Sequence, residues 1–328
     1  MKRRDDILMG IVATLGMCLL IFDGKTALEG AREGVRLCLY TLIPTLLPFF
    51  FFSNVLTGVL IGRKIRILHP LGRLCRIPSG AEYMLLVGLL GGYPLGAQCI
   101  SQACEAGALS RRDGRRMLAF CNNCGPAFLF GVAGALFHDP AIPWLLFSIH
   151  LISALFVAFT IPGIPGQCVM EYRNKPTAVQ ALWNSIRAMA GVCGWVILFR
   201  VGISVLDRWV LWYLSPECRE IFHGFLELAN GCIGLDNVKS YQLRFIFCAV
   251  FLSFGGLCVT MQTYSIANKV DKDMYFPGKV LQSFISLFLA CLLCTPRWSV
   301  ISGLSAIIMA LLLRKKENRC RNPEKLVV

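Results

Sequence analysis

The sequence predicts an all-α, polytopic membrane protein, and three observations support this fold class. The first is composition: the 328 residues are 56% hydrophobic and only 16% charged, whereas soluble domains carry about a quarter charged residues. The second is a series of apolar segments close to the length of about 20 residues that crosses a hydrocarbon core. The third is the placement of Lys and Arg between these segments, which is typical of topology signals.

Composition and motifs also argue against other classes of protein. The net charge of +14 is spread between apolar segments, so we expect no nucleic-acid partner. The 16 cysteines lie mostly inside apolar segments, unlike the regular loop spacing of secreted disulfide frameworks. The sequence contains no HExxH, GxSxG or Walker A motif. We therefore expect no enzyme activity, no metal site and no organic cofactor.

Eight transmembrane helices are expected. The first starts with a basic cytoplasmic end and resembles a signal peptide, but no small-x-small cleavage site follows cleanly, so we interpret it as a transmembrane helix. The basic clusters before the first span and after the last one place both termini in the cytoplasm. The expected spans are Ile7–Phe22, Val35–Leu60, Met117–Phe137, Trp144–Ile161, Ala181–Leu206, Phe245–Ala267, Val280–Cys294 and Val300–Leu313.

The segment Ala81–Gly107 is expected to form a first hairpin. Its middle, Gly91–Gly96, contains three glycines and Pro94, which do not continue a helix cleanly. The basic clusters on both sides, Arg63–Arg76 and Arg111–Arg116, favour a return to the cytoplasmic face. Each arm has roughly ten residues and spans about 15 Å, half of a hydrocarbon core. We predict a re-entrant hairpin with a solute site at its tip, because broken backbone at that depth needs protein or water partners.

A second, weaker re-entrant hairpin is expected over Ile221–Leu235. This segment is too short to cross the membrane and is interrupted at Asn230-Gly231. If both hairpins return to the face they came from, most Lys and Arg residues lie on the cytoplasmic side. The asymmetry becomes smaller if both hairpins cross fully. The positive-inside rule therefore favours two re-entrant hairpins.

The interruptions are arranged as two inverted repeats. From Val35 the chain reads as span, broken hairpin, interrupted span and span, and the same order recurs from Ala181. Three crossings separate the starts of the two units, so their orientations are opposite. Paired interruptions of this kind indicate a site near the midplane of a secondary transporter. We expect an N-terminal transmembrane helix and outer loop (1–34), a first repeat (35–165), a second, inverted repeat (177–295), and a last transmembrane helix with a basic cytoplasmic tail (296–328).

Four spaced motifs carry a resemblance to a known family: GLLGGYPLGAQ, CNNCGPAFLFG, ELANG and LSFGGLCVTMQ. Over Val35–Ala267 the chain resembles sporulation integral membrane proteins that carry nucleoside-recognition, or gate, domain repeats. The resemblance implies kinship with concentrative nucleoside transporters. It also implies a role in bacterial endospore formation, in which such proteins are implicated in passing small anions such as dipicolinate between compartments. The chain departs from the family in its short length, in the charge of Arg200 and in Cys124, where a small hydroxyl residue is more frequent.

The candidate solute site lies between the two hairpin tips. Main-chain N–H groups at the start of a half-helix suit an anionic or carbonyl oxygen. Asn122 and Asn123 could hydrogen-bond between helices, but two adjacent amides followed by Gly-Pro favour a break lined by polar groups. The residues expected to bind the solute are Gly91, Gly92, Tyr93, Pro94, Gly96, Gln98, Asn122, Asn123, Gly125, Asn230, Gly231, Gly255, Gly256 and Gln262.

Two ionisable residues at membrane depth have alternative interpretations. Glu227 could carry a coupling proton or bind a sodium ion, or it could be solvated if the second hairpin lies shallow. Arg200 could neutralise Glu227, bind a substrate carboxylate, or extend to the outer interface. The Cys121/Cys124 spacing matches a redox CxxC, but without a thioredoxin-like context we interpret it as coincidence.

The sequence therefore predicts a secondary or facilitative transporter in the cell membrane. The expected solute is small, polar and anionic, such as dipicolinate, or is a nucleoside, and a coupling proton or sodium ion is the one cofactor considered. The alternative is a non-transporting component or regulator of the sporulation machinery, and an intramembrane enzyme is the least favoured reading. The expected partners are the solute and the lipid bilayer, and a homo-oligomer is left open.

Overall fold

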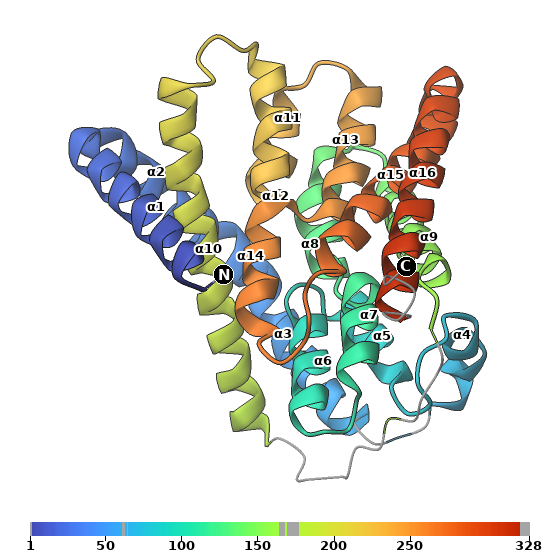
Figure 1. The fold of residues 1–328 in the computed structure, drawn as a ribbon. Helices are drawn as coiled ribbons and strands as arrows, with labels where there is room; N and C mark the ends of the chain where they lie inside the picture. The colour runs from blue at the N-terminus through green and yellow to red at the C-terminus, as the bar shows by residue number, and fades with distance from the viewer. Residues whose placement is uncertain (1, 61–62, 64, 164–167, 169–176, 322–328) are drawn as a thin grey trace, which may run out of the picture.

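The computed structural model describes residues 2–60, 63, 65–163, 168 and 177–321, and every element in this part of the chain is a helix (Figure 1). The predicted all-helical, polytopic class is confirmed. The first of the eight expected spans, Ile7–Phe22, lies in the first helix but is not among the seven stretches that meet the length and hydropathy of a span. Its Ala13–Phe22 part is a shorter apolar helix. The seven stretches long and apolar enough to cross a membrane are Gly24–Leu60, Arg111–Leu136, Ala141–Thr160, Ala178–Trp209, Tyr241–Ile266, Tyr275–Cys294 and Trp298–Asn318.

Among the described residues, most consecutive helices are joined by short connections. Short π or 3-10 turns occupy Cys38–Leu42, Arg66–Leu68, Leu129–Ala133, Gly134–Leu136 and Leu235–Asn237. The α-helices are α1 (Lys2–Phe22), α2 (Gly24–Leu37), α3 (Ile43–Leu60), α4 (His69–Leu74), α5 (Glu82–Leu90), α6 (Leu95–Glu105), α7 (Arg111–Cys121), α8 (Pro126–Phe128), α9 (Ala141–Thr160), α10 (Ala178–Trp209), α11 (Pro216–Leu226), α12 (Leu228–Gly234), α13 (Tyr241–Phe254), α14 (Gly256–Ile266), α15 (Tyr275–Cys294) and α16 (Pro296–Arg321).

Helices α5 and α6 form the first hairpin. The chain turns between them at Gly92, whose φ of 77° is the left-handed conformation that glycine adopts without a steric penalty. The two arms approach closely, because a Cβ added to Gly96 would lie 3.0 Å from the Cα of Gly88. A Cβ on either glycine would also overlap the carbonyl oxygen of Cys121. The hairpin therefore packs against α7 through a face that only glycine permits.

Helices α11 and α12 form the second hairpin. The position expected for its break, Asn230-Gly231, is wrong. The helix ends at Glu227, whose backbone is extended at φ −142° and ψ 123°, and Asn230-Gly231 lies inside α12. Glu227 ends one helix and caps the next, because its carboxylate accepts hydrogen bonds from main-chain N–H groups of α12. Gly231 serves packing instead, since a Cβ there would overlap the Cα of Gly224.

Two of the spans are interrupted where they pass the hairpins. The stretch from α7 to α8 breaks at Asn122–Gly125, and Pro126 starts the new helix at a position where its missing N–H is tolerated. The stretch from α13 to α14 breaks at Gly255-Gly256, with φ of 82° and 78°. Both breaks fall where the sequence predicted them.

The elements occur in the same order in the two halves of the chain. Helix α3, the first hairpin, the interrupted α7–α8 span and α9 are matched by α10, the second hairpin, the interrupted α13–α14 span and α15. In Figure 1 the first hairpin lies in the lower part of the molecule and the second hairpin in the upper part. The two hairpins thus approach the middle of the helix bundle from opposite ends.

The close packing of the first hairpin against α7 leads to a prediction about stability. Gly88→Ala should lower the free energy of unfolding by about 1–3 kcal/mol, the usual cost of overpacking, because its Cβ meets the Cys121 backbone. The midpoint of thermal unfolding in detergent measures this change. Gly191→Ala is the matched control, since a Cβ on this α10 glycine meets no atom within 4 Å. An unchanged midpoint for Gly88→Ala would contradict the packing of the hairpin on α7.

Candidate functional site

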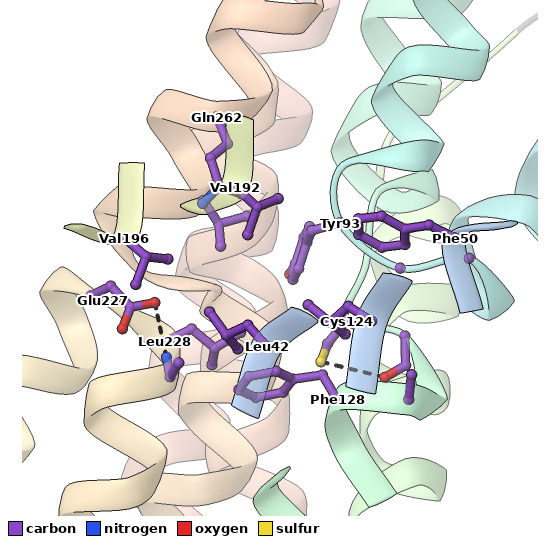
Figure 2. Close-up of a pocket in the computed structure, with 17 residues that line it drawn as sticks. Leu42, Phe50, Tyr93, Cys124, Phe128, Val192, Val196, Glu227, Leu228 and Gln262 are labelled. Atoms are coloured by element: carbon purple, nitrogen blue, oxygen red, sulfur yellow. Dashed lines mark hydrogen bonds between the residues drawn. The ribbon is translucent and has the colours of Figure 1, made fainter. Parts of the chain in front are cut away.

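A small cavity of about 50 Å³ lies where the hairpins and the interrupted spans meet (Figure 2). Gly91, Gly92 and Tyr93 of the first hairpin line one side, and Glu227 and Leu228 of the second hairpin line the other. Apolar side chains of α3 and α10 close the remaining walls. A volume of this size holds only a few water molecules. In this conformation the cavity is therefore too small for an organic solute.

Close main-chain contacts join each hairpin tip to the interrupted span of its own half. A Cβ added to Gly92 would lie 2.8 Å from the main-chain nitrogen of Gly125. A Cβ added to Gly256 would lie 3.1 Å from the carbonyl oxygen of Leu226. Tyr93 bridges the halves, because its hydroxyl is 3.1 Å from the position of a Cβ on Gly255. The four breaks in the helices thus gather around one point.

Glu227 is a buried carboxylate at the tip of the second hairpin. It is 2% exposed and accepts hydrogen bonds from the main-chain N–H groups of Ala229 at 3.0 Å and Asn230 at 2.7 Å. The side-chain amide of Asn230 donates a third bond at 2.7 Å. These donors stand at the positive end of α12, which stabilises a negative charge. Glu227 reaches the cavity on one side, and Asn230 faces an open space on the other.

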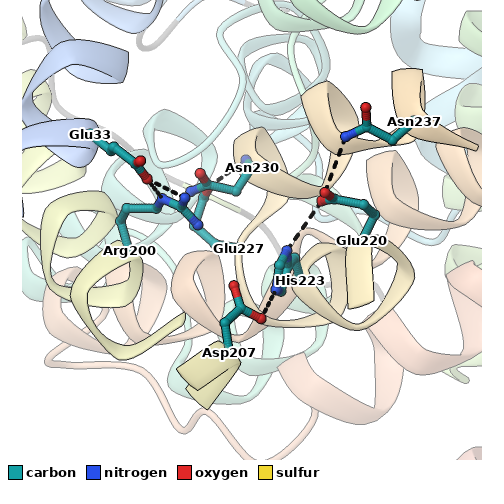
Figure 3. Close-up of polar contacts among 8 residues, drawn as sticks. All are labelled: Glu33, Arg200, Asp207, Glu220, His223, Glu227, Asn230 and Asn237. Carbon is teal, nitrogen blue, oxygen red and sulfur yellow. Dashed lines mark hydrogen bonds and ion pairs between the residues drawn. The ribbon is translucent and has the colours of Figure 1, made fainter. Parts of the chain in front are cut away.

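That open space, which we call the vestibule, has a volume of about 440 Å³ and is lined by α2, α10 and the second hairpin. Figure 3 shows the contacts among its polar side chains and Glu227. Arg200 forms an ion pair with Glu33 at the edge of the vestibule. His223 lies between two carboxylates, 2.8 Å from Asp207 and 3.2 Å from Glu220. The vestibule is therefore a polar chamber separated from the apolar cavity by Glu227 and Asn230.

On the other side of Tyr93 lies a buried polar cluster built on the α7–α8 break. The side-chain amide of Asn122 donates to the hydroxyl of Thr263 at 2.9 Å. Asn123 accepts hydrogen bonds from the ammonium of Lys279 at 3.0 Å and from the amide of Gln282 at 3.1 Å. All five side chains, including Thr263, are at most 3% exposed. The cluster connects α7, α14 and α15, and its hydrogen bonds satisfy polar groups that would be costly to bury alone.

The comparisons with known proteins give one informative match. The chain is similar to a sporulation integral membrane protein. This relative is YlbJ of Bacillus subtilis (strain 168), which is 24% identical over 329 residues, covering 85% of this chain and 80% of the relative. No protein-family model matches the chain, and no solved structure matches it. The match to YlbJ, together with the seven apolar helices, supports a multi-pass membrane protein related to a sporulation protein.

The structure brings some of the residues singled out in the sequence together at the cavity and places the others elsewhere. Those that line the cavity are Gly91, Gly92, Tyr93, Gly125, Glu227 and Gln262. Gly255 and Gly256 contact the tips, and Asn122 and Asn123 belong to the buried cluster. Asn230 and Arg200 line the vestibule. Four others, Pro94, Gly96, Gln98 and Gly231, do not line the cavity, and Gly96 and Gly231 serve helix packing.

Arg200 has an ion-pair partner, Glu33, that the sequence did not predict. Its guanidinium contacts Glu33 of α2 and does not hydrogen-bond Glu227, although its charge acts on that carboxylate electrostatically. Glu33 was not considered from the sequence, because it precedes the second expected span in what was interpreted as a loop. The helix α2 that carries it faces α10 closely, since a Cβ on Gly34 would lie 2.9 Å from the Cα of Ile197.

Sequence reasoning missed Lys279 and Gln282. Lys279 was assigned to a cytoplasmic loop because the expected span began at Val280, whereas α15 begins at Tyr275. A signal was present: Tyr275, Lys279, Gln282 and Ser286 recur at helical spacing in an otherwise apolar helix. All four are buried. A polar stripe on an apolar helix indicates a face turned toward the protein interior.

The position of His223 in the vestibule leads to a prediction about the pH dependence of stability. His223 is in α11, outside the seven candidate spans. Burial acts to lower the pKa of His223, but hydrogen bonds to Asp207 and Glu220 outweigh it and raise the pKa to about 9. A raised folded-state pKa gives stability that is complete below the ordinary value of about 6.5 and is lost as pH rises through the folded-state value.

We therefore expect the thermal midpoint of the wild type to fall from about pH 6.5 to about pH 9 more steeply than that of His223→Gln. His138→Gln, which removes an exposed histidine, is the control and should follow the wild type. Parallel curves for the wild type and His223→Gln would contradict the bridge between Asp207 and Glu220.

Proposed function

We propose that the protein is a secondary or facilitative membrane transporter of a small polar solute, in the setting of bacterial endospore formation. The favoured solute is an anion such as dipicolinate, with a nucleoside as the second class. The similarity to a sporulation integral membrane protein supports the cellular setting. The observation that carries the transport proposal is the convergence of four helix breaks on one cavity.

The convergence of helix breaks supports transport because interrupting a helix at membrane depth costs free energy. A helix interrupted at membrane depth leaves main-chain groups that only protein or a watery cavity can satisfy. Secondary transporters use such half-helix ends to bind solutes near the bilayer midplane, between repeats of opposite orientation. The nucleoside-recognition repeats, and the kinship with concentrative nucleoside transporters, are part of the same proposal.

We further propose that both hairpins are re-entrant and that both termini are cytoplasmic. The solute would reach the cavity from the outer vestibule by displacement of the second hairpin, and from the cytoplasm by displacement of the first. The vestibule of about 440 Å³ reaches Asn230, one hydrogen bond from Glu227. Glu227 is therefore the candidate for a coupling proton or sodium ion. The occluded cavity corresponds to the intermediate between the two open states.

The alternative of a non-transporting regulator would use the basic loops to dock a partner. Arg115 and Arg116 are unsuited to this, because both are buried. Arg115 bonds Asp273 at 2.6 Å and Glu317 at 2.5 Å, and Arg116 donates to the carbonyl oxygen of Cys75 at 3.1 Å. Only Arg111 and Arg112 of that loop are exposed. The Arg111–Arg116 segment is therefore mainly an internal brace. Arg63, Arg66, Arg73 and Arg76 of the other basic cluster are exposed, so docking through that cluster is the form that the alternative takes.

Uptake into liposomes that contain the purified protein tests the proposal. Radiolabelled dipicolinate and uridine should each be compared with protein-free liposomes. Asn123→Ala removes the acceptor shared by Lys279 and Gln282 and should slow uptake of the transported solute about tenfold or more, or about 1.4 kcal/mol in transition-state terms. The thermal midpoint shows whether the variant is folded.

Asn268→Ala is the matched control, because it truncates an exposed amide in the α14–α15 loop, and it should transport like the wild type. Uptake no faster than through protein-free liposomes for every solute tried, together with an Asn123→Ala variant that behaves like the wild type in cells, would refute the transporter.

A further inference from the structure

Lys279 is an ammonium buried in the centre of the protein without a carboxylate partner among the described residues. Its side chain is 0% exposed, and its hydrogen bonds go to Asn123 and to Gln282 at 2.8 Å. The nearest buried carboxylate on the cavity, Glu227, is held by three N–H donors of its own hairpin. Buried charges are normally paired or neutralised, so this amine is exceptional.

The amide groups around Lys279 are oriented to accept from it. The amide nitrogen of Asn123 donates to the carbonyl oxygen of Phe120 at 2.6 Å, which directs its oxygen toward Lys279. The amide nitrogen of Gln282 donates to that same oxygen, which directs the Gln282 oxygen toward Lys279 as well. Two neutral oxygens therefore face one ammonium. They accept hydrogen bonds from two of its three N–H groups and supply no negative charge to compensate a protonated amine.

Two tyrosine rings complete the surroundings of Lys279. Its nitrogen lies 5.3 Å from the ring centre of Tyr93 and 5.9 Å from that of Tyr275, within the range of cation–π attraction. Tyr93 also lines the cavity. The ring of Tyr93 therefore contacts both the amine of Lys279 and the cavity. At such short range in a medium of low dielectric, the charge acts strongly on whatever occupies the cavity.

The hydroxyl of Tyr93 is the second observation that indicates a ligand. It is buried and has no hydrogen-bond partner. A buried polar group without a partner costs about 1–3 kcal/mol, so a group that supplies the missing bond is favoured. A carboxylate in the cavity would accept that bond from Tyr93, and it would face the positive charge behind the ring.

We propose that Lys279 determines solute specificity by selecting carboxylates, with the Tyr93 hydroxyl as its hydrogen-bonding partner at the cavity. This inference rests on the proposed function and names the charge that the bound solute must carry. Since the cavity of about 50 Å³ is too small for an aromatic carboxylate, binding requires Tyr93 and the first hairpin tip to move. That movement brings the ammonium into contact with the solute space.

Equilibrium binding to the purified full-length protein in detergent tests the inference directly. The probes are dipicolinate and pyridine-2,6-dicarboxamide, which has a similar shape and no charge. The wild type should bind dipicolinate about tenfold more tightly than the dicarboxamide, or better. Lys279→Gln should abolish this preference, and Tyr93→Phe should weaken dipicolinate binding several-fold.

Two variants control for charge and for folding. Lys279→Arg keeps the positive charge and should keep the preference for dipicolinate, although its affinity changes with side-chain shape. Lys269→Gln removes an exposed charge near the start of the α14–α15 loop and should bind like the wild type. Thermal midpoints of all variants report on folding.

The inference is overturned if the wild type binds neither probe, if it shows no preference, or if a folded Lys279→Gln protein keeps the preference. Its failure is distinguishable from failure of the transport proposal. Selective binding that depends on Lys279, without uptake into liposomes, supports the specificity residue and refutes transport. Uptake of both probes at equal rates supports transport and overturns the role of Lys279.

Discussion

The need to satisfy main-chain N–H and C=O groups in a medium without water is the constraint on which this structure depends. Four helices are broken in the interior, and each break is covered by protein backbone. Gly92 lies against Gly125, and Gly256 lies against Leu226. These contacts are closer than a side chain would allow, which explains why the breaks are rich in glycine. The cavity at their meeting point follows from the same geometry.

Two kinds of sequence signal predicted the fold well. Long apolar segments predicted the spans. The clusters Gly91–Gly96 and Gly255-Gly256 predicted two of the four breaks, because glycine with positive φ has few other uses in an apolar helix. The polar residues Asn122 and Asn123 followed by Gly125-Pro126 predicted a third. The fourth break was predicted a few residues too far along the chain. Asn230-Gly231 looked like an interruption, but a carboxylate at Glu227 ends the helix by capping its successor. Capping by an acid at membrane depth is hard to recognise without the structure.

The site was predicted less completely than the fold, and Lys279 shows why. A lysine next to an apolar segment was counted as a topology signal, since most such lysines lie in loops. The burial of Lys279 depends on where α15 begins and on which helices cover its first turns. The sequence around Lys279 predicts neither of these. The polar stripe from Tyr275 to Ser286 is visible only once the helix is extended by one turn. Arg200 was similarly ambiguous until α2 brought Glu33 beside it.

The entry of the two hairpins from opposite faces is the central claim, and labelling of single cysteines with a membrane-impermeant maleimide tests it most directly. Exposed positions flank both hairpins: Arg73 and Arg112 the first, Tyr213 and Lys239 the second. In a background without the exposed Cys18 and Cys218, cysteines at Arg73 and Arg112 should react only from the cytoplasmic face. Cysteines at Tyr213 and Lys239 should react only from the outside. If the two ends of either hairpin react from different faces, that segment crosses the membrane and the account is wrong.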